Sequence, residues 1–186
     1  NPVYVSSFNF NNGAVETIYP YGNYLFIGSM TGMYLFDAND KDNPKQLSVF
    51  EHARVCDPVV ADGDYAYVTL RSGNECQGFT NQLDVVDVRN MEKPKLVKSY
   101  PMFNPHGLAK DGGTLIICEG KEGLKFMDVL AADNVQLIST LKGMTTYDVI
   151  TLGGYALVSA ADGLYIVDYS NPSAPKISST VKITKQ

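Results

Sequence analysis

The sequence predicts an all-β protein, a β-propeller built from four four-stranded repeats. A short apolar motif that closes on an aspartate recurs at residues 32–37, 83–87, 123–128 and 163–168. Its aspartates, at positions 37, 87, 128 and 168, are separated by 50, 41 and 40 residues. Short apolar runs that repeat with a period near forty and are separated by turn residues are typical of propeller blades.

Each repeat is expected to contain four strands. The innermost strands are predicted at residues 15–19, 58–61, 107–110 and 148–152, and the second strands at 24–27, 65–68, 114–117 and 155–158. A dipeptide that contains glycine, which favours a tight hairpin, separates the two strands in every repeat. The aspartate motif forms the third strand, and its aspartate should accept a hydrogen bond from the backbone that turns into the fourth. Pro44, Pro94 and Pro175 mark the start of that fourth strand, an edge position that tolerates proline.

The repeats define one propeller domain of four blades, at residues 13–52, 53–103, 104–143 and 144–186. Residues 1–12 are interpreted as the last strand of a preceding blade, because residues 1–8 resemble the other fourth strands. The chain then holds one fourth strand more than its complete repeats can use. This excess favours a section of a larger propeller, with a closed four-bladed ring as the alternative.

Charge and hydropathy argue against nucleic-acid binding and against a membrane-spanning helix. The net charge of −5 and the pI near 4.9 work against nucleic-acid binding, which needs a basic face. The chain contains no apolar run near the roughly 20 residues that a membrane-spanning helix requires. We therefore expect a soluble globular chain that neither binds nucleic acid nor spans a membrane with a helix.

The three cysteines differ in their expected positions. Cys56 precedes an inner strand and Cys76 lies in an insertion placed at the same end of the fold, so a disulfide between them is reasonable. It would indicate an oxidising compartment. The alternative is three unpaired thiols in a cytosolic protein. Cys118 shares a column of small residues with Gly28 and is predicted to be a free, buried thiol.

Polar residues from successive repeats are predicted to meet at one mouth of the central channel. Alignment of the repeats places Glu16, Asp57, His106 and Tyr147 in one column, with Asp148 in the next. Such a ring is a reasonable site for a small ligand or a cation. The alternative is that these residues only hydrate the channel and cap loops.

The second repeat carries a lengthened loop within residues 70–82, so that 22 residues separate Tyr65 from Asp87. Loops lengthened on a rigid scaffold often carry recognition residues. Arg71, Asn74 and Phe79, with Arg54, are candidates to hold a carboxylate or to stack on a sugar or peptide. The alternative is a tolerated surface loop without a binding role.

The repeats resemble the LVIVD-repeat family of β-propellers. Residues 65–68 (YAYV), 163–168 (GLYIVD) and 170–175 (SNPSAP) match its second strand, third strand and approach to the fourth. Residues 56–60 and 71–76 look like a subgroup of exported surface lipoproteins of Gram-negative bacteria. The resemblance implies the propeller fold and export to the periplasm or cell surface, where a lipid anchor is one way in which such proteins are held. It does not indicate the ligand.

The predicted function is a non-enzymatic binding or scaffold module of the cell envelope, which uses one propeller face to engage a protein, peptide or glycan. No catalytic set, cofactor or metal site is predicted. The alternative is a hydrolase or lyase at the channel mouth around His106, with Asp57 and Glu16 and with or without a metal.

Overall fold

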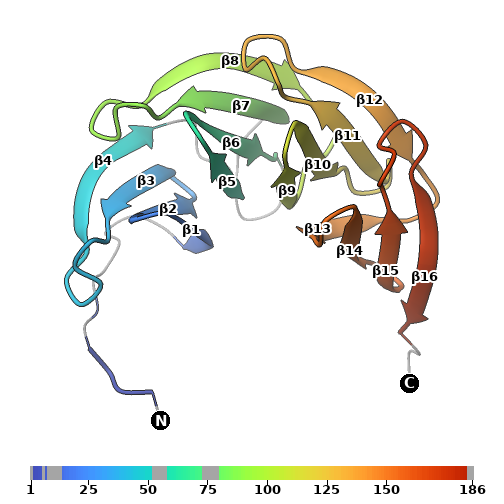
Figure 1. The fold of residues 1–186 in the computed structure, drawn as a ribbon, viewed down its shortest axis with the longest axis horizontal. Helices are drawn as coiled ribbons and strands as arrows, with labels where there is room; N and C mark the ends of the chain where they lie inside the picture. Colours follow the sequence, from blue (N-terminus) through green and yellow to red (C-terminus); the bar gives the residue numbers. More distant parts are fainter. Residues whose placement is uncertain (1, 6, 8–13, 52–57, 73–79, 184–186) are drawn as a thin grey trace.

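The computed structural model describes residues 2–5, 7, 14–51, 58–72 and 80–183 of the chain. The described residues form strands and no helix, and the strands assemble four four-stranded antiparallel sheets in a ring, a four-bladed β-propeller (Figure 1). This confirms the predicted fold class. In Figure 1 the ring is open between the first and the last blade.

The four blades follow the chain in order. Blade 1 contains β1 (Val15–Tyr21), β2 (Tyr24–Ser29), β3 (Gly32–Asp37) and β4 (Lys45–Glu51), and blade 2 contains β5 (Val59–Asp62), β6 (Tyr65–Leu70), β7 (Gln82–Asp87) and β8 (Lys95–Pro101). Blade 3 contains β9 (Leu108–Asp111), β10 (Thr114–Cys118), β11 (Leu124–Asp128) and β12 (Gln136–Leu141), and blade 4 contains β13 (Thr146–Thr151), β14 (Tyr155–Ala160), β15 (Gly163–Asp168) and β16 (Lys176–Lys182). Within each blade the first strand lies nearest the centre and the fourth lies outermost (Figure 1).

The closing aspartates shape the turns into the fourth strands, as predicted. Each accepts a hydrogen bond at Oδ1 from the backbone N–H two residues later. The four N···O distances are 2.8 Å at Asp37, 3.0 Å at Asp87, 2.9 Å at Asp128 and 3.0 Å at Asp168. After these turns, Pro44, Pro94 and Pro175 directly precede β4, β8 and β16.

A register shift recurs at the same place in every blade, between the third and fourth strands. It falls between Leu35 and Phe36 in blade 1 and between Ile166 and Val167 in blade 4, with equivalent shifts in blades 2 and 3. Such bulges increase the local right-handed twist. The repeated shift therefore gives the four outer strands a common curvature.

Residues 2–5 and 7 are not assigned to a strand in the described structure. Val3 and Tyr4 are 81% and 78% exposed. An outer strand is held by hydrogen bonds to the third strand of its own blade, and the structure pairs this segment with none. The assignment of residues 1–12 to a preceding blade remains a prediction.

The core lies between the blades. The inner strand β1 contacts β5, β5 contacts β9, and β9 contacts β13. Apolar side chains from facing sheets fill each gap, as Phe26 and Val68 do between blades 1 and 2 and Phe126 and Val158 do between blades 3 and 4. The polar ends of the inner strands consequently line the channel. Among the described residues, no helix is long and apolar enough to cross a membrane.

Candidate functional site at the channel mouth

Residues from all four blades line one cavity at the mouth of the channel. Its volume is about 210 Å³, and its walls are Glu16, Thr17, Pro58, Arg71, His106, Gly107, Tyr147 and Asp148. The structure thus brings together Glu16, His106, Tyr147 and Asp148 of the predicted mouth with Arg71 of the predicted loop. Asp57 lies outside the described residues.

Two of the mouth residues stand at irregularities of the inner strands. The pairing of β1 with β2 shifts between Val15 and Thr17, and the pairing of β13 with β14 shifts between Thr146 and Asp148. Glu16 and Tyr147 are therefore the extra residues of two equivalent bulges. A bulge redirects a side chain from the regular alternation of the strand. The common column predicted for these residues thus coincides with a repeated backbone feature that the sequence did not reveal.

His106 is held by contacts on several sides. Its imidazole lies edge-on to the Tyr147 ring, with 5.4 Å between centroids, and its Nε2 lies 3.1 Å from Asn104 Nδ2. Its carbonyl accepts a hydrogen bond of 2.7 Å from the Thr69 hydroxyl in blade 2. Burial, reinforced by the positive charge of Arg71, lowers the pKa of His106 to about 4. The imidazole is therefore neutral at neutral pH.

Glycine is required beside the acidic side of the mouth. A Cβ built on Gly107 would lie 2.1 Å from Asp148 Oδ1, so no larger residue fits without displacing that carboxylate. Asp148 Oδ1 also accepts a hydrogen bond of 2.9 Å from the Val149 N–H. This hydrogen bond holds the Asp148 carboxylate at the rim, in the space that the absence of a side chain on Gly107 leaves open.

A fully buried carboxylate that sequence reasoning missed supports the segment leading to His106. Glu119, directly after β10, is 0% exposed. Its Oε2 accepts hydrogen bonds from the N–H groups of Phe103 and Asn104, at 3.0 and 2.9 Å, and its Oε1 pairs with Lys125 Nζ at 3.2 Å. In the sequence, Glu119 lies in a short turn rich in glycine and charged residues, which is typical of a solvent-exposed loop. No sequence pattern therefore indicated that its side chain is buried.

The base of the lengthened loop is fastened to the linker between β8 and β9. The Asn81 side-chain carbonyl accepts hydrogen bonds from the Ser72 N–H and hydroxyl, at 2.8 and 3.0 Å, and its amide donates to the Phe103 carbonyl at 2.8 Å. Arg71 directly precedes this anchored pair. The loop stem therefore holds Arg71 at the mouth.

Several predicted residues fall outside the part of the chain that the structure describes. These are Arg54, Asn74, Phe79 and the two cysteines proposed to form a disulfide, Cys56 and Cys76. Cys118 is a free, buried thiol, as predicted, and burial raises the pKa of this thiol.

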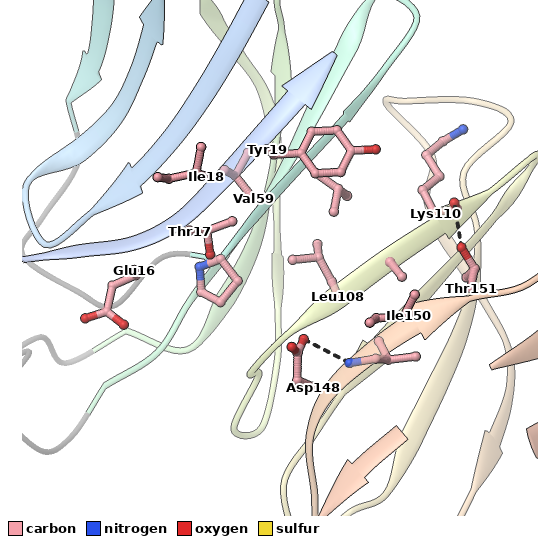
Figure 2. Close-up of a pocket in the computed structure, with 14 residues that line it drawn as sticks. Glu16, Thr17, Ile18, Tyr19, Val59, Leu108, Lys110, Asp148, Ile150 and Thr151 are labelled. Atoms are coloured by element: carbon pink, nitrogen blue, oxygen red, sulfur yellow. Dashed lines mark hydrogen bonds between the residues drawn. The ribbon is translucent and has the colours of Figure 1, made fainter. Parts of the chain in front are cut away.

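Below the mouth, the four inner strands line a larger cavity of about 480 Å³. Glu16 and Asp148 lie toward its mouth end, and Tyr19 and Lys110 toward its other end (Figure 2). The Lys110 ammonium is paired with Asp62 and donates to the Gly112 carbonyl. Its charge is thus compensated, which leaves Arg71 as the cationic group of the mouth cavity.

The described residues contain no metal centre: no group of three or more of their His, Cys, Asp or Glu side chains is placed to hold an ion. Glu16 and His106 share the mouth cavity without meeting this condition. What the described geometry offers is a guanidinium, two carboxylates, a neutral imidazole and a phenol around one small hollow.

Comparison with known proteins agrees with this architecture. A sequence model of the LVIVD repeat matches residues 53–101 and 143–182, which cover blades 2 and 4. This match supports the resemblance of the chain to the LVIVD-repeat family. A search of curated proteins gave no match.

Solved structures share the fold at low sequence identity. BamB from Moraxella catarrhalis superposes with a TM-score of 0.64 at 16% identity, over 92% of this chain and 51% of its own. The β-propeller domain of Cps50 (Swd1) from Myceliophteria thermophila gives a TM-score of 0.66 at 15% identity, over 89% and 58%. Glutaminyl cyclase from Myxococcus xanthus superposes with a TM-score of 0.59 at 12% identity, over 86% of this chain and 67% of its own. The chain spans about half the length of the first two, and these similarities concern the fold alone.

Proposed function

We propose that this LVIVD-type propeller is a non-enzymatic binding module whose channel mouth holds a polar segment of a partner protein. The observation that carries the proposal is the mouth cavity, which is lined by residues from all four blades. A rigid scaffold that gathers loop and strand-end residues at one face is the usual way in which such folds bind partners.

The size and charge of the cavity favour a peptide segment. The mouth cavity of about 210 Å³ is of a size to hold one side chain or a chain end. The Arg71 guanidinium suits a carboxylate, whereas Glu16 and Asp148 suit an ammonium or N–H group. A peptide carries both kinds of group, whereas a neutral glycan would use only the Tyr147 ring and hydrogen bonds.

The enzymatic alternative has weaker support. A general base works best with a pKa near the working pH, and His106, with its pKa near 4, is a poor proton acceptor at neutral pH. Glutaminyl cyclase shares the fold, but fold similarity at 12% identity carries no activity over. Elemental analysis for bound metal, with substrate screening of the protein and of His106→Ala, would favour the enzyme if it found stoichiometric metal or an activity lost with this histidine.

We also propose that the module works in the cell envelope, in the periplasm or at the cell surface. The family resemblance and the disulfide predicted from the sequence between Cys56 and Cys76 motivate this location. Cell fractionation of the native source tests it, together with mass spectrometry of the non-reduced protein for a Cys56–Cys76 peptide. Recovery in the cytosol with both thiols reduced would contradict it.

The binding proposal is tested by pull-downs from envelope extracts with the wild-type protein, Arg71→Ala and Arg89→Ala. Arg89 is an exposed arginine in the turn after β7, away from the mouth, and serves as the matched control. We expect a partner that both the wild type and Arg89→Ala recover and that Arg71→Ala loses. Equal recovery by Arg71→Ala, or competition by neutral glycans rather than by peptides, would contradict the proposal.

A further inference from the structure

The neutral imidazole of His106 carries its proton on Nδ1. Its Nε2 lies 3.1 Å from Asn104 Nδ2, and because an amide nitrogen can only donate, Nε2 is the acceptor of this contact. A neutral imidazole has a single N–H group, which must then lie on the other ring nitrogen. Within the described ranges, this Nδ1–H has no acceptor. His106 therefore brings an unused donor to the cavity that it lines.

Two donors of the mouth suit one carboxylate. Arg71 lines the same cavity as His106, and the charge of Arg71 contributes to the low pKa of the imidazole. No ion pair of Arg71 occurs among the residues that the structure describes. A guanidinium and an N–H group that both lack an acceptor at one hollow are the groups that bind a carboxylate.

The same cavity also carries two carboxylates that can receive a basic group. Glu16 and Asp148 extend from β1 and β13 at the mouth end of the channel (Figure 2). Neither has an ion-pair partner in the described part of the chain. One hollow of about 210 Å³ therefore combines a subsite for a carboxylate with a subsite for an ammonium or guanidinium group. A terminal residue of a peptide can carry both charges at once.

A second hollow lies beside the mouth, between blades 3 and 4. Its volume is about 320 Å³, and its charged residues are Lys121 and Asp162. Asp162 is paired with Lys182, whereas Lys121 has no ion-pair partner among the described residues. A hollow with one uncompensated ammonium group suits an acidic side chain.

A backbone bridge without protruding side chains separates the two hollows. Gly120 pairs with Thr146 in this bridge, and Thr146 is 0% exposed. A Cβ built on Gly120 would lie 3.4 Å from His106 Nε2, so His106 borders the bridge on the mouth side. Tyr147 lines the mouth and Thr145 lines the second hollow. Residues two apart in an extended chain are roughly 7 Å apart, which is also the spacing of alternate side chains in a bound extended peptide.

The order of the subsites favours a C-terminus. Glu16 and Asp148 line both the mouth and the larger cavity below it, whereas Arg71 and His106 line the mouth but not the larger cavity. A chain that crosses the bridge meets His106 first, so its α-carboxylate lies at Arg71 and His106 while a long basic side chain extends toward Glu16 and Asp148. An acidic N-terminal residue would need its α-ammonium beyond the mouth and its short side chain turned back.

We propose that the mouth binds the C-terminal residue of a partner chain, a lysine or arginine, and that an acidic residue two positions earlier binds in the second hollow. This inference rests on the proposed function and narrows its peptide segment to a free C-terminus. Arg71 and the His106 Nδ1–H receive the α-carboxylate, Glu16 and Asp148 receive the basic side chain, and Lys121 receives the acidic one.

The donor assigned to His106 is checked on the free protein. Long-range ¹H–¹⁵N NMR spectra at neutral pH should show a neutral imidazole with its proton on Nδ1. A ring protonated on Nε2 would overturn the carboxylate subsite.

Two libraries of random peptides test the choice of terminus, one attached through its N-termini and one through its C-termini. We expect the wild type to retain peptides only from the library with free C-termini, enriched in lysine or arginine at the last position and in aspartate or glutamate two positions earlier. Arg71→Ala should lose this retention, and Lys121→Ala should lose only the preference for the acidic residue. Lys95→Ala, at the exposed start of β8, is the matched control and should behave as the wild type does.

Fluorescence anisotropy with the labelled peptide Gly-Gly-Ser-Glu-Ala-Lys isolates the terminal carboxylate. The form with a C-terminal amide should bind roughly 10- to 100-fold more weakly than the free acid, because it lacks the charged acceptor for Arg71 and His106. Equal binding of the two forms, or no retention from the library with free C-termini, would overturn the inference. If the pull-downs still recover a partner that depends on Arg71, the proposed function stands without it. No retention from either library and no such partner would overturn both.

Discussion

Glu119 is the residue whose removal should disturb the mouth most without touching it. Glu119→Ala leaves the N–H groups of Phe103 and Asn104 without their acceptor and Lys125 without its partner. We expect the free energy of unfolding to fall by roughly 2–4 kcal/mol, as for other buried charged groups that lose a partner. Urea denaturation followed by circular dichroism measures this loss.

Glu119→Gln is the control for that loss. Glutamine keeps a carbonyl oxygen for the two N–H groups and gives up only the ion pair with Lys125. It should therefore cost clearly less than alanine. Equal losses for the two variants would show that the backbone hydrogen bonds do not carry the effect.

Asp62 should make stability depend on pH. The hydrogen bond from Lys110 is the main cause that lowers the pKa of Asp62, with smaller contributions from the Lys110 charge, Tyr21 and the Gly63 N–H. A carboxyl group whose pKa is lower in the folded state stabilises the fold above its unfolded pKa of about 3.9. That contribution is lost as the pH falls through the lower, folded pKa.

The melting temperatures of the wild type and Asp62→Asn should therefore differ at neutral pH and converge in acid. In a Lys110→Met background the difference at neutral pH should shrink, since the two side chains act as a pair. A difference that persists unchanged below pH 3 would contradict this account of the pair.

At the scale of single strands, the entry to the third strand requires glycine for two separate reasons. Gly123 has a φ of 88°, and a Cβ built on it would lie 2.2 Å from the Leu141 carbonyl oxygen. Gly143 has a similar φ of 97°, but a Cβ there would meet nothing within 4 Å. The two positions thus separate the cost of the backbone angle from the cost of the close approach.

Gly143→Ala should lower the free energy of unfolding by about 1–2 kcal/mol, the cost of a left-handed backbone angle for a residue with a Cβ. Gly123→Ala should cost more, because the outer strand must also move. Thermal and urea unfolding of both variants measure the difference. Equal costs would mean that β12 yields freely at Leu141.

The parts of each blade that depend on local sequence were predictable. The third strands Gly32–Asp37 and Gly163–Asp168 agree with the expected residues at both ends, because glycine and aspartate mark the two ends by local backbone chemistry. The bulges at Glu16 and Tyr147 were not predictable, since a register shift depends on which residue of the neighbouring strand accepts the pairing. The strand expected over residues 1–8 depends on a partner strand in another blade, so local sequence does not decide it and it stays a prediction.

The candidate site divides in the same way. Its column of Glu16, His106 and Tyr147 could be read from the repeat alignment, since equivalent positions of successive blades meet around one axis. The hydrogen bonds of Glu119 and Asn81 join segments from different hairpins and blades, and no periodic pattern encodes them. The sequence therefore predicted which residues line the mouth but not which residues hold them there.

At the scale of the whole molecule, the account depends on the ring bringing residues of different blades to one mouth. Arg71 belongs to blade 2 and His106 to blade 3, yet both line the same cavity, and the charge of Arg71 contributes to the low pKa of His106. This coupling can be measured without any ligand. It exists only if the blades are arranged as described.

The most direct measurement is an NMR titration of the His106 imidazole in the wild type, in Arg71→Ala and in Arg89→Ala. A His106→Asn variant assigns the signal, because the chain has only two histidines. We predict a pKa near 4 in the wild type, a higher value in Arg71→Ala that stays below about 6.5 because burial remains the larger cause, and no change in Arg89→Ala. A wild-type pKa near 6.5, or one that does not respond to Arg71→Ala, would contradict a mouth shared by the blades.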